Sequence, residues 1–352
     1  MDQIAFDRHH GGVNLCSTFV DFSVSTNPFG APPAVLEAYH RAAATIGAYP
    51  ELYAATLTAA IADHLGVAPA NVLASNGSTQ LFYLIARVLR PRRPFVVIPT
   101  FSEIANSLLA MAAAPSSVVL RRERRFQFDL DDLILALAAG ADALFLGRPN
   151  SPTGSTIDLG IVSAIAQRCA AARCWCVIDE AFIDFADDPA SAVALVKEFE
   201  QMIVVRSMTK LYGIPGLRLG YLVASAKVTS ELARALEPWS VSGPAAAVGS
   251  ACLAQPDGWR EAIRDAIRGE RAFLAQQLAA LPGFSVYPST ANFLMFETSA
   301  PGACVFSSHM RDCGIAVRDL ATLPGAGPGF YRIAVRSRPD NIRLLEAARS
   351  HR

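Results

Sequence analysis

A lysine, an aspartate and an arginine follow apolar segments of the sequence, at positions where their side chains could act together. Lys210 comes shortly after the apolar run MIVVRS, and Arg218 follows it eight residues later. Asp179 ends a second apolar run, CWCVID. A single lysine is most often a solvated surface residue, but Lys210 lies in an apolar stretch with several glycines, which let a backbone pass close to a ligand. This setting favours a buried amine.

Asp179 has two interpretations. An acid at this point can cap the helix that follows a strand, which is an ordinary role of aspartate. The same residue lies at the predicted mouth of the sheet, where ligands of open α/β sheets bind. A carboxylate so close to a buried strand needs a cationic partner, and this requirement favours a functional role.

Two further segments contain polar residues at the ends of predicted strands. In SNGSTQLFYLIARVL, Gly77 turns the chain and an apolar helix begins at Ser78. The free N–H groups of that helix, with the hydroxyls of Ser78 and Thr79, can bind a phosphate, although the pattern alone favours an ordinary helix cap. Asn150 follows the run ALFLG, where a turn residue is the default interpretation.

Taken together, these residue types match the requirements of pyridoxal phosphate. A lysine forms a Schiff base with its aldehyde. A carboxylate keeps the pyridine nitrogen protonated, so that the ring can accept electrons. An arginine and hydroxyl groups hold its phosphate through charge-assisted hydrogen bonds.

The elements that position these residues alternate between strands and helices. The chain has 352 residues, which predicts about two domains. Apolar runs predict strands at 71–75, 94–99, 117–122, 143–147, 174–179, 202–207 and 219–224. Periodic segments predict helices at 33–46, 52–65, 78–89, 102–113, 129–139 and 157–171. This alternation indicates an α/β fold with a mostly parallel sheet covered by helices on both faces.

Beyond about residue 225 the pattern changes to long helices, at 226–237 and 243–280, followed by the short apolar runs FSVYP, NFLMFE, IAVRD and YRIAV. We interpret this part as a smaller α+β C-terminal domain. The expected organisation is an N-terminal arm (1–30) that packs with the small domain, a large cofactor-binding domain (31–228) and the small domain (229–352).

The composition excludes several classes of protein. Lys+Arg and Asp+Glu both number 31, and this balance argues against a nucleic-acid partner. No apolar stretch reaches the roughly 18 uncharged residues that a membrane span needs. The first ten residues contain two acids and do not resemble a signal peptide. Cysteines that stay reduced imply a cytoplasmic protein, which is what we expect. The seven cysteines are expected to be reduced and structural, and we expect no metal site.

As a set, the motifs identify a family. The order Asn-Gly-Ser-Thr, Pro-Asn-Ser-Pro-Thr-Gly, Asp-Glu-Ala-Phe, Ser-x-Thr-Lys and Arg resembles the fold-type I pyridoxal-phosphate enzymes of the class I/II aminotransferase family, over almost the whole chain. Within that family the sequence is most similar to the L-threonine-O-3-phosphate decarboxylases of cobalamin synthesis, and next to the histidinol-phosphate aminotransferases. Further matching stretches are HGG, DFSVSTNPFG, AYPE, PWSV and YRIAVRSRPDN.

The resemblance implies a role for individual residues. Lys210 would bind the cofactor covalently and transfer protons, and Asp179 would pair with the ring nitrogen. Phe101 would stack on the ring and Asn150 would bind its hydroxyl. The cofactor phosphate would be held by Gly77, Ser78, Thr79, Ser207 and Arg218. Tyr49 would reach the phosphate in a partner subunit, which implies a homodimer with active sites at the interface.

The resemblance also implies a small phosphorylated amino acid as substrate. Arg332 would bind its carboxylate, and Arg318, with His10 and Asn27, its phosphate. Some positions depart from the family pattern. Ser151 stands where many relatives have Asn, which leaves open whether Asn150 or Ser151 contacts the ring hydroxyl. Phe182 stands where many aminotransferases have Tyr. The segment between HGG and DFS is short.

The expected reaction is decarboxylation of L-threonine-O-3-phosphate to (R)-1-amino-2-propanol phosphate. The alternatives are an aminotransferase acting on a phosphorylated or anionic amino acid such as histidinol phosphate, and a related enzyme of a secondary pathway. A non-catalytic regulator that binds the cofactor is a further alternative, which the presence of Lys210 disfavours.

Overall fold

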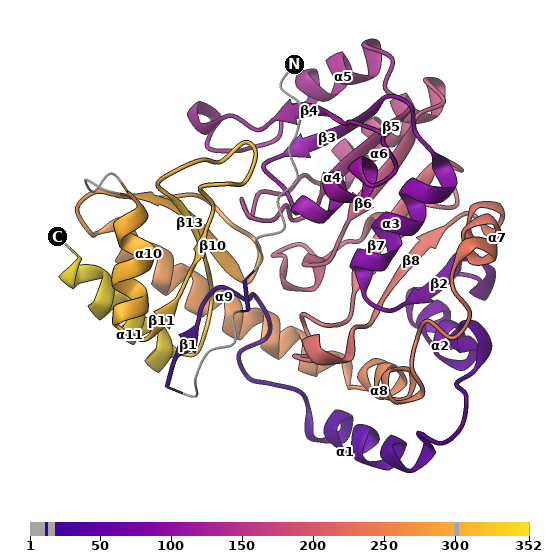
Figure 1. The fold of residues 1–352 in the computed structure, drawn as a ribbon, viewed down its shortest axis with the longest axis horizontal. Helices are drawn as coiled ribbons and strands as arrows, with labels where there is room; N and C mark the ends of the chain where they lie inside the picture. The colour runs from indigo at the N-terminus through magenta and orange to yellow at the C-terminus, as the bar shows by residue number, and fades with distance from the viewer. Residues whose placement is uncertain (1–10, 13–17, 299–302, 352) are drawn as a thin grey trace.

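A seven-stranded sheet forms the centre of the larger part of the protein (Figure 1). The computed structural model describes residues 11–12, 18–298 and 303–351. Neighbouring strands are parallel except at β8, which is antiparallel to both of its neighbours. In spatial order the strands are β2 (Val72–Ser75), β8 (Gly220–Ala224), β7 (Met202–Ser207), β6 (Trp175–Asp179), β5 (Ala143–Gly147), β3 (Pro94–Ile98) and β4 (Ser116–Val119).

Helices cover both faces of this sheet, which explains why its strands are almost continuously apolar. Alternate residues of β7 show the two faces, because Ile203 and Val205 pack in one cluster while Met202 and Val204 pack in the other. One face is covered by α3 (Ser78–Leu89), α4 (Ser102–Leu109) and α7 (Ala226–Ala235). The other is covered by α2 (Ala55–Leu65), α5 (Leu130–Ala138), α6 (Leu159–Ala171) and α8 (Gly243–Leu253).

A four-stranded antiparallel sheet forms the centre of the smaller part. Its strands, in spatial order, are β12 (Arg318–Asp319), β13 (Phe330–Ala334), β10 (Phe293–Thr298) and β9 (Phe284–Val286). The helices of this part are α9 (Asp257–Ala279), α10 (Ala303–Asp312) and α11 (Arg338–Ser350). Near the N-terminus, β1 (Val20–Asp21) pairs in parallel with β11 (Ile315–Ala316), so the arm joins the smaller part.

The long helix α9 packs against both parts of the protein (Figure 1). Ile267 is buried in the core around the large sheet, while Leu274 and Leu278 are buried in the core of the smaller part. Short 3-10 helices connect other elements, at Ala43–Thr45, Leu52–Ala54, Pro69–Asn71, Arg122–Arg124, Ile183–Phe185, Ala192–Leu195 and Pro215–Leu217.

The structure confirms the predicted fold class and corrects some element boundaries. The helix predicted at 243–280 is two helices, because Pro256 lacks an N–H donor and disfavours helical geometry in the residue before it. The helix predicted at 102–113 ends at Leu109, close to Ala112 with its φ of +56°. The sequence did not predict β1, α10 or α11.

The domain boundary predicted at residue 228 falls inside α7. This helix packs on α3 and β2, and α8 packs on α2 and on α1 (Pro33–Ala42), all elements of the larger part. We therefore propose that the small domain begins later, within α9. Within the described part of the chain, no helix is both long and apolar enough to cross a membrane. The described cysteines are free thiols, namely Cys169, Cys174, Cys176, Cys252 and Cys313.

Candidate active site

A cavity of about 840 Å³ lies at the carboxyl ends of the large-sheet strands. This is the edge of an open α/β sheet at which ligands bind. Its wall is completed by the N-terminal arm and by β12 and β13 of the small sheet. Most of the predicted site residues line it, namely Gly77, Ser78, Thr79, Phe101, Asp179, Ser207, Lys210, Arg218, Arg318 and Arg332.

Asp179 and Lys210 are the titratable pair on the large-sheet side of the cavity. Asp179 is 9% exposed, and its Oδ1 accepts a hydrogen bond of 2.9 Å from the backbone N–H of Ala181. Burial raises the pKa of Asp179 to about 6, against the opposing effects of that N–H and of Lys210. Burial, together with Arg332 and Arg218, lowers the pKa of Lys210 to about 8. Both groups are therefore tuned towards neutral pH, as acid–base groups of active sites are.

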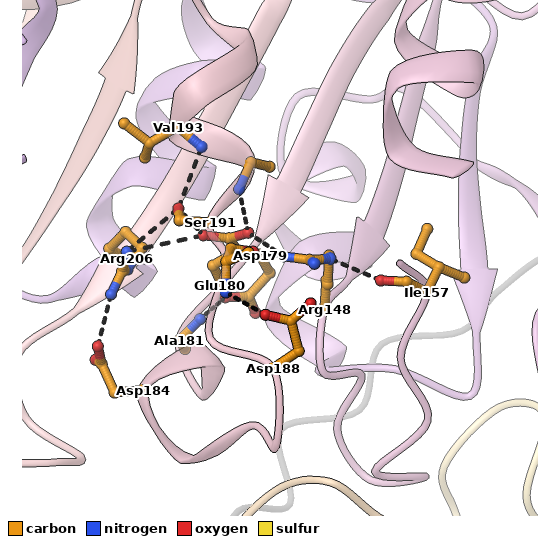
Figure 2. Close-up of polar contacts among 12 residues, drawn as sticks. Arg148, Ile157, Asp179, Glu180, Ala181, Asp184, Asp188, Ser191, Val193 and Arg206 are labelled. Carbon is orange, nitrogen blue, oxygen red and sulfur yellow. Dashed lines mark hydrogen bonds and ion pairs between the residues drawn. The ribbon is translucent and has the colours of Figure 1, made fainter. Parts of the chain in front are cut away.

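A buried ionic network holds the turn that carries Asp179 (Figure 2). Next to Asp179, Glu180 is fully buried, and its Oε1 accepts hydrogen bonds from Arg148 Nη1 (2.9 Å) and from the N–H of Ala192 (2.8 Å). Its Oε2 accepts from Ser191 Oγ at 2.5 Å. The backbone N–H of Arg148 donates to the carbonyl of Asp179 itself at 2.8 Å.

Arg206 completes this network from the neighbouring strand, β7. Its Nη1 lies 3.8 Å from Glu180 Oε2, and its Nη2 donates to Asp184 Oδ1 at 2.8 Å. Sequence analysis missed Arg148, Glu180 and Arg206. The available signal was a charged residue inside an apolar strand, since Arg206 lies in MIVVRS and a buried charge requires a partner.

The predicted phosphate site has the geometry of a cradle at the start of α3. The helix cap is Gly77, with φ of +81° and without a side-chain cap hydrogen bond, so the interpretation as an ordinary Ser/Thr cap is wrong. A Cβ at Gly77 would lie 2.7 Å from Arg218 Nη2, and one at Gly220 would lie 2.5 Å from the backbone nitrogen of Ser78. At Gly220 the obstacle is backbone, and at Gly77 the positive φ disfavours any side chain, so both positions favour glycine. N–H groups at a helix start beside an arginine fit a phosphate.

Two arginines form the small-sheet side of the cavity. Arg318 on β12 is the register partner of Arg332 on β13. Arg332 Nη1 donates to Ser151 Oγ (2.9 Å) and Nη2 donates to the carbonyl of Ser23 (2.8 Å). Burial and the charge of Arg318 lower the pKa of Arg332 to about 10. A buried cation and a half-buried cation, paired on neighbouring strands, favour anionic ligands.

The structure places three predicted residues outside the cavity lining, namely Asn150, Asn27 and Tyr49. Asn150 is fully buried and uses its whole amide, donating to the carbonyl of Pro99 and to Thr153 Oγ1 and accepting from Thr100 Oγ1. Its contact with the ring hydroxyl therefore stays a prediction, whereas Ser151 does line the cavity.

Asn27, the second of these residues, anchors the arm to the lysine loop. Its Nδ2 donates to the carbonyl of Leu211 at 3.0 Å, and its backbone N–H donates to the carbonyl of Lys210 at 2.9 Å. Tyr49 is 84% exposed, with its ring 5.0 Å from that of Trp239. His10 lies outside the described residues. The roles of these residues remain predictions.

Sequence analysis also missed an acid–phenol pair in the lining. Tyr83 Oη donates to Glu103 Oε2 at 2.8 Å, and both residues line the cavity. Glu103 is 8% exposed. The available signal was an acidic residue two positions after Phe101, in a helix that is otherwise buried.

Comparisons with known proteins agree with this site. The family model for aminotransferase class I and II matches residues 17–348. The threonine-phosphate decarboxylase of Salmonella typhimurium is 36% identical, over 98% of this chain and 97% of that protein. The histidinol-phosphate aminotransferase 2 of Archaeoglobus fulgidus is 32% identical, over 94% of this chain and 92% of that protein.

A solved structure shows the same fold. The histidinol-phosphate aminotransferase of Clostridium acetobutylicum superposes with a TM-score of 0.87, covering 93% of this chain and 97% of that one at 22% identity. The chain thus belongs to the class I and II aminotransferase family. It is a pyridoxal-phosphate-dependent enzyme of fold type I, and the predictions of family, fold and cofactor are confirmed.

Proposed function

We propose that this enzyme removes CO2 from L-threonine-O-3-phosphate to form (R)-1-amino-2-propanol phosphate. One observation carries the proposal, which is the pairing of Arg318 with Arg332 on the cavity wall. A substrate with a carboxylate and a phosphate presents one anionic group for each guanidinium. The similarity to the relative named threonine-phosphate decarboxylase supports the same substrate.

The residues of the large sheet would hold the cofactor. Lys210 would bind its aldehyde, Asp179 would accept a hydrogen bond from its protonated ring nitrogen, and Phe101 would cover one face of its ring. The start of α3 and Arg218 would hold its phosphate. The remaining phosphate contacts would come from Gly77, Ser78, Thr79 and Ser207. These assignments rest on the positions of the side chains around one cavity.

Bound pyridoxal phosphate supplies an electron-accepting ring. This ring stabilises the negative charge that remains on the substrate Cα when a bond to Cα breaks. The residues of the chain decide which bond that is. Arg332 and Arg318 would fix the orientation of the carboxylate and of the phosphate. Lys210, with its pKa lowered to about 8, would hold the proton that replaces CO2 at Cα.

The alternative function is transamination of histidinol phosphate or a related anionic amine. The observation in its favour is that relatives and structural neighbours with this activity in their names match the chain almost as fully. Both reactions use the same cofactor site. They differ in whether the arginines present the carboxylate or the hydrogen of Cα for cleavage.

We further propose a homodimer. Large apolar side chains are exposed along the segment from Phe29 to Tyr53, and the exposed Trp239 packs beside Tyr49. Such a patch is typical of a surface that binds another protein. A second copy of the chain is the proposed partner, with Tyr49 reaching the cofactor phosphate of that copy.

One experiment separates the two reactions. The enzyme charged with pyridoxal phosphate is incubated with L-threonine-O-3-phosphate, once alone and once with 2-oxoglutarate, and CO2 and glutamate are both measured. CO2 release without the keto acid is the expected result. Glutamate formed only with 2-oxoglutarate would instead establish an aminotransferase. Absence of both products would overturn the substrate assignment.

A further inference from the structure

Ser25 is part of the arm segment that borders the cavity, together with Ser23 and Val24. The arm is fixed on both sides of it. Before it, the carbonyl of Ser23 accepts a hydrogen bond of 2.8 Å from Arg332 Nη2. After it, the backbone N–H of Asn27 donates to the carbonyl of Lys210 at 2.9 Å. Ser25 therefore lines the cavity between the arginine on β13 and the lysine loop.

The hydroxyl of Ser25 is buried and unpaired. The residue is 2% exposed, and its Oγ finds no hydrogen-bond partner in the described ranges. Its neighbour Ser23 differs, because Ser23 Oγ donates to Asp21 Oδ1 at 2.6 Å and accepts from the N–H of Gly12 at 3.0 Å. A buried hydroxyl without a hydrogen-bond partner lowers the stability of the protein. A ligand that forms a hydrogen bond with this hydroxyl removes that cost.

A second unpaired group lies on the same side of the cavity. Arg332 uses Nη1 and Nη2, but its Nε is buried and also lacks a partner within the part of the chain that the structure describes. Arg318 and Lys210 add positive charge to the same cavity. A hydroxyl beside several cations donates best to an anionic oxygen.

We propose that the Ser25 hydroxyl donates a hydrogen bond to the anionic group of the substrate that Arg332 binds. Ser25 is then a specificity-determining residue, and the arm selects substrate as well as covering the cavity. This inference rests on the proposed function for the identity of the substrate. With Arg332 assigned to the carboxylate, the expected group is the carboxylate, and the test distinguishes it from the phosphate, which offers the same acceptor chemistry.

The first test is binding of L-threonine-O-3-phosphate and of L-threonine to the cofactor-charged enzyme, measured by titration calorimetry. Ser25→Ala should weaken binding by about 10- to 100-fold, as for loss of a hydrogen bond to a charged group. Equal losses for both ligands assign the carboxylate, and a loss confined to the phosphorylated ligand assigns the phosphate. Unchanged affinity for both ligands would overturn the proposal.

A double-mutant cycle with Arg332→Gln tests whether the two residues share one ligand group. Ser25→Ala should cost clearly less affinity in the Arg332→Gln background than in the wild type, because residues that hold one group are coupled. Full additivity would show that Ser25 acts on another part of the substrate, and would overturn the assignment to Arg332.

Thr229→Val is the matched control. Thr229 lies on α7, away from the cavity lining, and its hydroxyl is likewise buried without a partner in the described structure. This variant should keep the wild-type affinity.

A stability measurement separates a ligand contact from a structural role. Without substrate, Ser25→Ala should have the same or a higher melting temperature than the wild type. A lower one would indicate a structural role for Ser25.

These outcomes are distinct from failure of the proposed function. If L-threonine-O-3-phosphate binds but releases no CO2, the reaction assignment fails while the comparison of Ser25→Ala with the wild type remains valid. If neither ligand binds the wild type, the substrate assignment fails. The same variants are then compared on L-glutamate, whose carboxylate should show the same loss for Ser25→Ala.

Discussion

Arg318 and Arg332 are directly opposed on two antiparallel strands, so both guanidinium groups project from the same face of the small sheet. Like charges in this arrangement destabilise a sheet. Burial makes the repulsion stronger, and it lowers the pKa of Arg332 to about 10. Such a pair is retained where an anionic ligand relieves the repulsion.

The assignment of the substrate phosphate to Arg318 predicts that mutation of this residue affects the phosphorylated ligand more than L-threonine. Arg318→Gln should weaken binding of L-threonine-O-3-phosphate by about tenfold or more, because a charge-assisted hydrogen bond contributes about 1.5–3 kcal/mol. Binding of L-threonine should change much less, which calorimetry would measure. Arg343→Gln, at an exposed position away from the cavity lining, is the control and should match the wild type. Equal losses for both ligands would contradict the assignment of the phosphate to Arg318.

The raised pKa of Asp179 predicts a pH dependence of stability in the cofactor-free protein. The pKa rises from 3.8 to about 6, so the folded state binds the proton more tightly than the unfolded state. The contribution of this group is present below pH 4 and is lost as pH rises through about 6. The shift corresponds to about 3 kcal/mol.

Asp179→Asn should remove this slope, leaving the variant more stable than the cofactor-free wild type at pH 7. Urea unfolding between pH 4 and pH 7 measures the effect. The same variant should bind pyridoxal phosphate more weakly, because the partner of the ring nitrogen is lost. A variant that keeps the wild-type slope between pH 4 and pH 6 would show that another group titrates there.

The buried network around Glu180 predicts a large loss of stability when it is broken. Glu180→Gln leaves Arg148 and Arg206 without their shared carboxylate, and should lower the free energy of unfolding by about 3–5 kcal/mol. Chemical denaturation measures it. Glu200→Gln is the matched control, since Glu200 pairs with Lys227 at the surface, and it should change stability little. If Glu180→Gln and Glu200→Gln lowered the free energy of unfolding equally, burial would not explain how much the network stabilises the protein.

The cradle at Gly77 predicts a specific loss of cofactor affinity. Gly77→Ala introduces a Cβ 2.7 Å from Arg218 Nη2 and should weaken pyridoxal phosphate binding at least about tenfold, or about 1.4 kcal/mol. Gly66→Ala is the control, because Gly66 also has a positive φ, of +65°, but open space around its Cβ. Gly66→Ala should lose about 1 kcal/mol of stability from the backbone strain, and Gly77→Ala should lose more, because its ψ of 154° at positive φ belongs to a region that essentially only glycine adopts. Only Gly77→Ala should lose cofactor, which equilibrium dialysis would detect.

The proposed dimer predicts complementation between two inactive variants. Tyr49→Phe and Lys210→Ala should each be strongly impaired. If Tyr49 serves the partner's site, mixed dimers contain one native site, and refolding the variants together should restore about a quarter of the wild-type activity. Mixtures that stay as inactive as the separate variants would place Tyr49 in the site of its own subunit.

The sequence predicted the elements around the cofactor well because each has a local signal. Apolar runs mark the buried strands, and the predicted helix 78–89 matches α3 because Gly77 defines its start. The network of Arg148, Glu180 and Arg206 could not be predicted, because its members meet only through the order of β5, β6 and β7. The register that pairs Arg318 with Arg332 is likewise a tertiary property. Ser25 lies within the matching stretch DFSVSTNPFG, but nothing local predicts its unpaired hydroxyl, since only the path of the arm places it on the cavity.

The helix α9 has one half in each hydrophobic core, and this arrangement governs how the molecule comes apart. Melting the second half of α9 removes Leu274 and Leu278 from one core and frays the support of Ile267 in the other. We expect loss of order in either part to reach the other part through this one helix. We therefore expect the two parts to unfold together, and we expect neither part to fold alone when the chain is cut at residue 228.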